Sequence, residues 1–209
     1  MNLEEILKQI QVQLEISSDE IDWEDDETKA KITLVNSAIL TWATAKNTCW
    51  EELFEKVELG RIKAGENEFD LPKTVRSVCD VWTDGYNFME IRNIRDALKI
   101  GRGVYIAGNA KRGRTLNFAE NINANSDLVG KNIYAMCINQ PTLLKGPQDQ
   151  PEMSDPTFIV DYVCASIATD DDASKYSVFS ANYINKLNQM IEQNNNDLYD
   201  NGIDVTIGV

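Results

Sequence analysis

The strongest constraint on the fold is a helical repeat of apolar residues between positions 176 and 191. Side chains three and four residues apart share one helix face, whereas a strand sends neighbouring side chains to opposite faces. The face formed by this repeat consists of Tyr176, Phe179, Tyr183, Ile184, Leu187, Met190 and Ile191. The asparagine run 194–196 is expected to end the helix. The segment therefore predicts an amphipathic helix that must pack against other helices.

Three further segments have the same helical spacing. The first begins near Leu3, the second follows the acidic run at Asp25, and the third follows Asp155-Pro156, a typical helix start. Their apolar positions are Leu3, Ile6, Leu7, Ile10 and Leu14, then Ile32, Val35, Ala38, Ile39 and Trp42, and finally Phe158, Ile159, Tyr162, Val163 and Ile167. A short helix is also expected at Thr48, because Thr48 and Glu51 have capping-box spacing. We therefore expect residues 1–55 and 153–196 to form a helical bundle.

The middle of the chain contains short strand-like segments instead. These are residues 57–61, 68–71, 77–82, 104–106, 115–118 and 132–136, with turns rich in Gly, Asn and Asp between them. Residues 88–100 are ambiguous, although Met89, Ile94 and Leu98 would line a short helix. Strands at this spacing are typical of a small antiparallel barrel or sandwich. The predicted fold class is α+β, with a β-rich domain, residues 56–152, inserted into the helical bundle.

A C-terminal arm, residues 197–209, follows the predicted helices. Its hydrophobic residues alternate strictly after Asn201-Gly202, which is a strand pattern. The alternating residues are Ile203, Val205, Ile207 and Val209. Such a strand could fold back onto its own barrel or add to the sheet of another subunit. The second alternative implies an assembly in which the arm is an interface.

The charge of the chain restricts its partners. Its 34 acidic and 20 basic side chains give a net charge of −14, which repels both phosphate and anionic membranes. Neither a signal peptide nor an apolar run long enough to span a bilayer is visible, so we expect a soluble protein made in the cytoplasm. One basic cluster, at Lys111, Arg112 and Arg114, predicts either a solvated turn or a contact to an acidic partner or to passing DNA.

Few residues carry the chemistry that catalysis or metal binding needs. The chain has no histidine, which removes the usual general base and metal ligand, and its four cysteines are expected to be buried free thiols. The acidic runs 24–27 and 170–172 lie at predicted helix starts, where capping explains them. We therefore expect no enzyme, no cofactor and no metal site. Trp23 lies among acidic residues in a loop, which favours an interface anchor, whereas the other three tryptophans are predicted core residues.

The order of these segments resembles the head-to-tail adaptor proteins of tailed phages, also described as connector, neck-ring or tail-tube-A-like proteins. The resemblance spans most of the chain. It lies in residues 34–59 (LVNSAILTWATAKNTCWEELFEKVEL), 64–82 (AGENEFDLPKTVRSVCDVW), 104–120 (VYIAGNAKRGRTLNFAE), 131–144 (KNIYAMCINQPTLL) and the closing helical pair within 155–196. The first segment resembles the family's opening helices, and the middle ones resemble its barrel strands.

The resemblance implies a structural virion protein of the neck, assembled in the host cytoplasm. It implies a ring of about twelve copies that binds the portal protein and the tail or nozzle proteins, with no membrane partner. The genomic DNA would pass through the lumen without tight binding, which suits an acidic protein. The helices would dock on the portal and the barrel would face outward or toward the tail. A closed ring needs two complementary patches per copy, and we expect them on the last helix, around Tyr183 and Leu187, and on the arm.

Two alternatives share the same sequence features. One is a virion-carried glycan hydrolase that uses carboxylates, of which the chain has many but no recognisable catalytic pair. The other is a different tail-completion or stopper protein, which would share the strands and the lack of catalytic residues.

Overall fold

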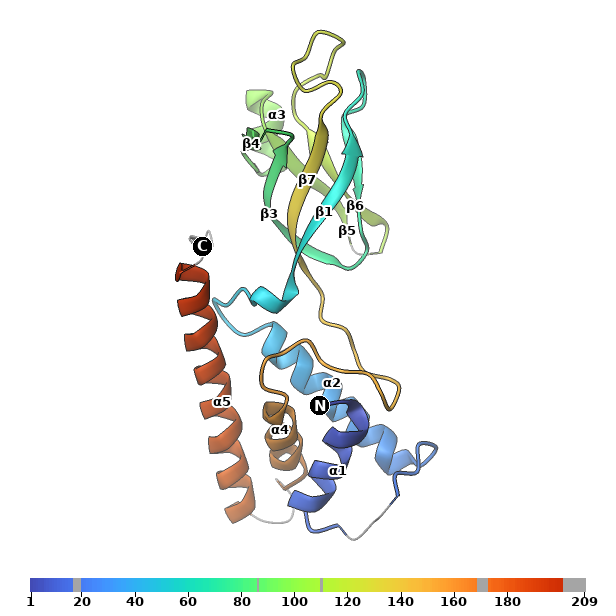
Figure 1. Ribbon diagram of the computed structural model, residues 1–209, viewed down its shortest axis with the longest axis vertical. Helices are drawn as coiled ribbons and strands as arrows, with labels where there is room; N and C mark the ends of the chain where they lie inside the picture. Colours follow the sequence, from blue (N-terminus) through green and yellow to red (C-terminus); the bar gives the residue numbers. More distant parts are fainter. Residues whose placement is uncertain (17–19, 86, 110, 169–172, 201–209) are drawn as a thin grey trace. The chain divides into compact units, whose positions relative to one another are not determined.

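The computed structural model describes residues 1–16, 20–85, 87–109, 111–168 and 173–200, with side chains described to residue 196 (Figure 1). Within these residues the fold is α+β, as predicted, with five α-helices and two antiparallel sheets. The chain divides into two compact units. The helical unit comprises Met1–Leu53 and Pro141–Val209, and the β unit comprises Phe54–Gln140. Residues 141–152, which the sequence placed in the β-rich domain, therefore belong to the helical unit.

The helical unit is built around α4 (Thr157–Ala168), which contacts α1 (Leu3–Gln13), α2 (Asp26–Ala43) and α5 (Ala173–Asp200) (Figure 1). Apolar side chains surround α4 on most sides, and its fully buried residues are Phe158, Ile159, Val160, Val163 and Cys164. A helix that is apolar nearly all round is stable only when its neighbours cover it. The stripes predicted for α1 and α2 supply that cover, together with part of the stripe predicted for α5. Tyr176 and Ile184, which the sequence placed on the buried face of α5, are instead 42% and 47% exposed.

Side chains cap the helices where the sequence placed their starts. Asn2 and Glu5 form a capping box at α1, with both of its N–H···O distances at 2.9 Å. The carboxylate of Asp25 accepts from the N–H of Thr28 at 3.1 Å and so caps α2. The carboxylate of Asp155 accepts from the N–H of Thr157 at the start of α4. These side chains therefore satisfy backbone N–H donors that each helix would otherwise leave free.

The connecting segment 141–152 is fixed to the helices by hydrogen bonds from both backbone and side-chain groups of α1 and α2. The N–H of Leu3 donates to the carbonyl of Asp149 at 2.9 Å. The Asn36 side chain bonds Leu144 twice, donating to its carbonyl at 3.0 Å and accepting from its N–H at 2.8 Å. Leu144 is completely buried. This proline-rich segment therefore packs with the helices, which is why the two compact units divide before Pro141.

The β unit contains two sheets that enclose one core. The first has the strand order β1 (Phe54–Arg61), β7 (Asn132–Asn139), β3 (Val75–Thr83) and β4 (Asn87–Met89). The second has the order β2 (Glu68–Leu71), β6 (Gly113–Phe118) and β5 (Val104–Asn109). The turn between β1 and β2 connects an edge strand of one sheet to an edge strand of the other without pairing them. The β unit therefore has two separate antiparallel sheets and no closed barrel, which was one of the two alternatives, barrel or sandwich, that the sequence left open.

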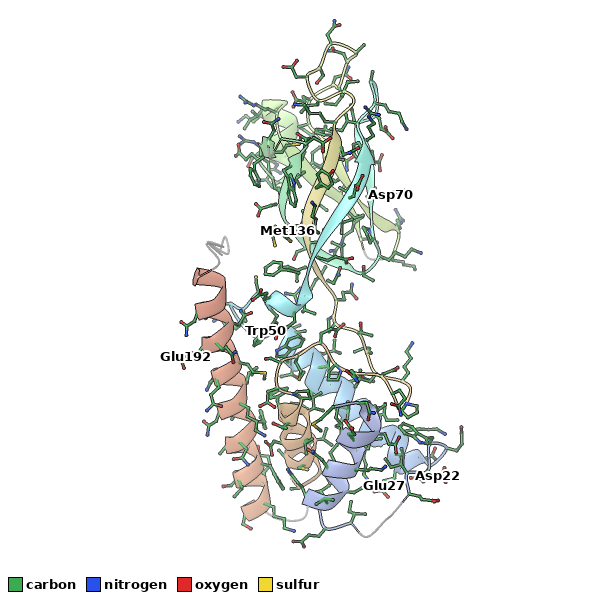
Figure 2. All side chains as sticks on the ribbon, in the orientation of Figure 1. Asp22, Glu27, Trp50, Asp70, Met136 and Glu192 are labelled. Atoms are coloured by element: carbon green, nitrogen blue, oxygen red, sulfur yellow. The ribbon has the colours of Figure 1, made fainter. Side chains whose placement is uncertain are left out.

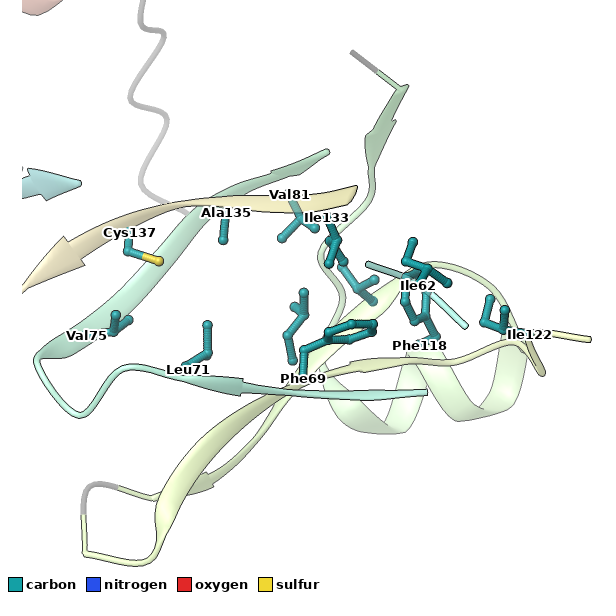
Figure 3. Close-up of a cluster of buried hydrophobic side chains, with 12 residues drawn as sticks. Ile62, Phe69, Leu71, Val75, Val81, Phe118, Ile122, Ile133, Ala135 and Cys137 are labelled. Atoms are coloured by element: carbon teal, nitrogen blue, oxygen red, sulfur yellow. The ribbon is translucent and has the colours of Figure 1, made fainter. Parts of the chain in front are cut away.

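The inner faces of the two sheets point toward each other (Figure 3). Val81, Ile133 and Ala135 come from the four-stranded sheet, and Phe69 and Phe118 come from the three-stranded sheet. The rings of Phe69 and Phe118 meet edge to face with their centroids 5.9 Å apart. Such a geometry is the favoured one for paired phenylalanines, so it helps to fix how the core packs.

Two helix ends differ from the sequence prediction. The helix α5 continues through Asn194–Asn196 and ends at Asp200, so the asparagine run does not stop it. The short helix expected at Thr48 is a single 3-10 turn, Glu51–Leu53.

The indole N–H of Trp50 donates to the carbonyl of Trp42 at 2.6 Å, and the two rings stack 5.0 Å apart. Trp42 and Trp50 are therefore core residues, as predicted.

Candidate interaction surfaces

The helix α5 has one face toward α4 and one toward solvent. Tyr183, a predicted interface residue, meets the rings of Phe158 and Tyr162 at centroid distances of 6.1 and 5.4 Å. Leu187 lies one turn further along, and both residues are half-buried. Their contacts are therefore mostly within the helical unit, and a contact to a neighbouring subunit stays a prediction for them.

The opposite side of α5 is almost free of charge. We call it the outward face of α5, and its exposed residues are Ser177, Val178, Ala181, Asn182, Ile184, Asn185, Asn188 and Gln189. Between Tyr176 and Ile191 the only charged residue is Lys186, and it pairs with Asp161 of α4. Glu192, just beyond this face, points away from the other helices (Figure 2). Because charged residues make up 26% of the chain, this uncharged stretch is unusual for an exposed helix face.

The basic cluster that the sequence predicted is split by the structure. Lys111 and Arg112 are exposed in the turn between β5 and β6, where their N–H groups both donate to the side chain of Asn109 at 3.0 Å. Arg114 is half-buried, and its guanidinium donates to the backbone carbonyls of Val75 and Arg76. Arg114 therefore ties β6 to the start of β3, and only the first two residues present free charge at the tip.

Trp23 lies before α2 in an acidic loop, as the sequence suggested. It is half-buried, and no hydrogen bond or ring contact of its indole is found in the described part of the chain. Around it, Asp22 and Asp26 are exposed, and the Glu24 side chain is 93% exposed (Figure 2). We call residues 20–27 the acidic segment. It combines six carboxylates with one tryptophan that is only partly packed.

The four alternating residues of the predicted arm interface lie outside the residues that the structure describes: Ile203, Val205, Ile207 and Val209. Both of their predicted roles stay predictions.

The ambiguous segment 88–100 forms β4 and α3 (Ile94–Ile100), and it carries a surface that the sequence prediction missed. Only Ala97 of α3 is buried, so Ile94 and Leu98 do not line a buried face. Four large apolar residues are instead more than half exposed: Phe88, Ile94, Leu98 and Ile100. Four basic residues accompany them: Arg92, Arg95, Lys99 and Arg102. We call these eight residues the α3 patch.

A cavity of about 490 Å³ opens beside the α3 patch. Its lining combines the apolar Phe88, Phe118 and Leu128 with two basic residues, Arg92 and Arg102, and two acidic ones, Glu90 and Glu120. The backbone at Gly103 forms part of its wall, where a Cβ atom would lie 2.7 Å from the carbonyl oxygen of Glu90. The volume is within the range of pockets that hold small ligands, so one aromatic side chain can enter it.

A signal for this surface was present in the sequence. The basic residues at 92, 95, 99 and 102 are spaced by three and four, which is helical spacing, and Asn93 is a good helix cap. The Asn93 side chain accepts from the N–H of Asp96 at 2.9 Å, and Gly101 closes the helix in the left-handed conformation at φ 67°. These cues define a helix, but they do not show that its apolar residues face solvent.

The outer face of the four-stranded sheet carries a row of aromatic rings. Trp82 of β3 lies between Tyr134 of β7 and Phe88 of β4, at centroid distances of 5.9 and 6.1 Å. The ammonium of Lys56 lies 4.5 Å from the centroid of the Tyr134 ring. Trp82 is 8% exposed because its neighbours cover it. The row therefore stabilises the outer face by cross-strand packing, and Phe88 at its end is the exposed member.

The cysteines match the predicted free thiols, but they are not all buried. Cys137 and Cys164 are fully buried, Cys49 is half-buried and Cys79 is exposed. Burial raises the pKa of the Cys137 thiol to about 11 and that of Cys164 to about 12. Cys79 lies at a bulge of β3, between Val78 and Asp80, which explains why its side chain leaves the core.

The described residues contain neither a candidate metal site nor a candidate membrane-spanning helix. No group of three or more Cys, Asp or Glu side chains there could hold a metal ion. None of the helices described is both long enough and apolar enough to cross a bilayer. No protein-family model matches the chain, and no curated protein matches it either.

Proposed function

We propose that this protein is a structural subunit of a tailed-phage virion, a ring-forming adaptor that joins the portal of the capsid to the tail. The basis for this function is the resemblance of the sequence to the head-to-tail adaptor family, and we propose no enzymatic activity. The observation that supports it best is the outward face of α5. A polypeptide that works by binding other proteins needs such a surface outside its own core.

The composition of the outward face of α5 supports a protein partner. Val178 and Ile184 are about half exposed, and the residues around them are small or carry uncharged polar groups. The cores of protein interfaces are depleted in charge, because each ion buried there loses its hydration. The stretch from Tyr176 to Ile191 would measure about 24 Å at 1.5 Å per residue, enough for a substantial contact. We assign this face to a neighbouring subunit of the neck, with the portal as the first candidate.

The two units would then divide the work of the adaptor. In this interpretation the helical unit is a bundle that docks on the portal, and the β unit is a small sandwich that faces outward or toward the tail. The net charge of −14 would keep DNA mobile in the lumen of a ring of about twelve copies. The arm, residues 197–209, keeps its two predicted roles.

Electron microscopy of the protein mixed with its portal tests the proposal. We expect a ring of density beneath the portal that is absent from the portal alone. A protein that stays monomeric and leaves the portal bare across a range of salt concentrations would contradict the adaptor function. Labelled protein located elsewhere in purified particles would favour the tail-completion or stopper alternative.

Variants of α5 make the test specific to its outward face. Val178→Glu with Ile184→Glu puts two charges on that face without changing buried residues, so the monomer should fold normally. We expect this variant to lose portal binding. Val12→Glu, which adds one charge away from α5, is the control, since Val12 is 76% exposed on α1, and it should bind like the unmodified protein.

A peptidoglycan zymogram tests the remaining alternative. The adaptor proposal expects no clearing at any pH between about 4 and 8, the range in which paired carboxylates work as acid and base. A clear band at the mass of the full chain would overturn the non-enzymatic part of the proposal.

A further inference from the structure

The α3 patch has the opposite charge balance from the rest of the molecule. Between Phe88 and Arg102, basic residues outnumber acidic ones by four to two, whereas in the whole chain acidic residues outnumber basic ones by 34 to 20. Arg95, Lys99 and Arg102 are exposed, and none of them has an ion pair among the described residues. Glu90 pairs with Arg92, so it offsets only that cation. The patch is therefore a locally basic surface on an acidic protein.

The apolar part of the α3 patch indicates which kind of partner it fits. Ile94 and Leu98 are 51% and 60% exposed, and they lie one turn apart on the same side of α3. These side chains gain free energy only where a partner removes them from water. A phosphate backbone does not do so, and an anionic bilayer would repel a chain of net charge −14. A protein surface that is acidic and carries an aromatic anchor complements both parts of the patch.

The chain itself presents such a surface in its acidic segment. Residues 20–27 contain six acidic residues and no basic one. Two nearby lysines pair with members of this segment, with Lys29 3.4 Å from Glu24 and Lys31 2.7 Å from Glu27. Trp23 supplies the aromatic side chain, and the cavity of about 490 Å³ beside the α3 patch is large enough to receive it.

We propose that the α3 patch of one copy binds the acidic segment of the next copy. Arg95 and Lys99 would face the carboxylates, the exposed apolar residues of α3 would pack against the loop, and Trp23 would enter the cavity. The contact joins two different surfaces, so repeating it gives a closed ring when the rotation between copies is right. This inference rests on the proposed function and names a contact that would hold the ring together.

Charge reversal with complementation tests the contact. One variant carries Arg95→Glu and Lys99→Glu, and the other carries Glu24→Lys and Asp26→Lys. Self-association of each is measured by sedimentation over a concentration series up to about millimolar, at about 50 mM salt where exposed charges are weakly screened. The control Lys63→Glu with Lys73→Glu makes the same change in net charge as the first variant, at exposed positions of the β unit.

Five results are expected if the contact exists. The unmodified protein associates as its concentration rises, and each reversed variant loses about tenfold or more in affinity. Mixing the two variants restores association, because each then offers the charge that the other needs. The control associates like the unmodified protein. Trp23→Ala weakens association without changing its dependence on salt, since it removes an anchor and no charge.

Other results would overturn the inference. These are a protein that stays monomeric to millimolar concentration, reversals that act no more strongly than the control, and a mixture that does not recover. Binding of duplex DNA, or of vesicles with one third phosphatidylserine, that Arg95→Glu with Lys99→Glu abolishes while self-association persists would assign the patch to those partners. None of these results would decide the proposed function, because the ring beneath the portal is tested separately and could form through other contacts.

Discussion

The ammonium of Lys186 on α5 lies 2.5 Å from Oδ2 of Asp161 on α4. The Asp161 side chain is 3% exposed and that of Lys186 is 29% exposed, so the carboxylate is the more deeply buried partner. This pair lies on the side of α5 opposite its outward face. The only charge within the stretch from Tyr176 to Ile191 therefore serves the attachment of α5 to α4, and it leaves the exposed side uncharged.

Replacing Lys186 with alanine should destabilise the helical unit strongly. The change leaves a buried carboxylate without its partner, which costs about 3 kcal/mol for a pair of this kind. Urea unfolding followed by circular dichroism measures the loss. The double variant Asp161→Leu with Lys186→Leu is the control, since removing both charges should cost much less than removing one. Equal losses for the two variants would contradict a charge-based role for the pair.

Asn194 should be essential for the position of the α5 end. Its side chain accepts from the N–H of Glu51 and donates to the carbonyl of Cys49, both at 2.9 Å, and it is 6% exposed. Asn194→Leu removes both part-buried hydrogen bonds, at a cost of about 1 kcal/mol for each. We expect a lower thermal midpoint. Asn195→Leu is the control because Asn195 is exposed, and a comparable loss there would mean that the bonds contribute little.

Asn194 also shows where sequence reasoning fails. Three consecutive asparagines are poor helix formers, and alone they predict a helix end. Asn194 is tolerated because its amide satisfies backbone groups of a segment more than 140 residues away. Such a contact leaves no local pattern. The buried stripes of α1, α2 and α4 were predictable because they repeat along one helix, as were the starts at Asn2, Asp25 and Asp155 whose side chains cap them. 

Some features of the candidate surfaces could likewise be predicted from the sequence, and others could not. The loop position of Trp23 among exposed acidic residues could be predicted from the sequence, whereas its role as an interface anchor stays a prediction. The split of Lys111 and Arg112 from Arg114 could not be predicted, because it depends on carbonyls of β3 that only the fold brings near. For Ile94 and Leu98 the helical spacing was visible, yet spacing alone does not say whether a helix face meets a core or solvent. Which face is covered depends on the packing of other elements.

The β5–β6 hairpin should depend on Gly108. Its φ is 85°, and an added Cβ would lie 2.2 Å from the carbonyl oxygen of Gly113 across the hairpin. Gly108→Ala therefore forces the two strands apart, and we expect a loss of about 3 kcal/mol or more, at the upper end for strained residues. Gly65→Ala is the control, because φ there is 83° but no atom lies within 4 Å. Its loss should be close to 1 kcal/mol, the strain of the backbone alone. Denaturant unfolding of both variants separates the cost of the steric clash at Gly108 from the cost of backbone strain, which both positions share.

The buried thiol of Cys164 should make stability decline at alkaline pH. Burial raises its pKa to about 12, and the nearby carboxylate of Asp161 acts in the same direction. In the unfolded chain the thiol ionises near pH 9, so its contribution is complete below that pH and is lost as the pH rises toward 12. We expect Cys164→Ala to flatten the decline in free energy of unfolding above pH 9, by at most about 1.4 kcal/mol per pH unit. An unchanged slope would contradict a buried, protonated thiol.

Thiol labelling should separate the four cysteines by burial. Attack on an electrophile requires the thiolate, so a raised pKa and a closed core both slow the reaction. At pH 8 we expect iodoacetamide to modify the exposed Cys79 first and the half-buried Cys49 more slowly. Cys137 and Cys164 should react only as fast as their units unfold, and all four should react at once in denaturant. Peptide mass spectrometry over time follows each site, with Cys79→Ser as the control that removes the fast phase. Rapid modification of Cys137 in the folded protein would mean that the two sheets of the β unit open more readily than the sealed core predicts, since that thiol lies wholly inside it.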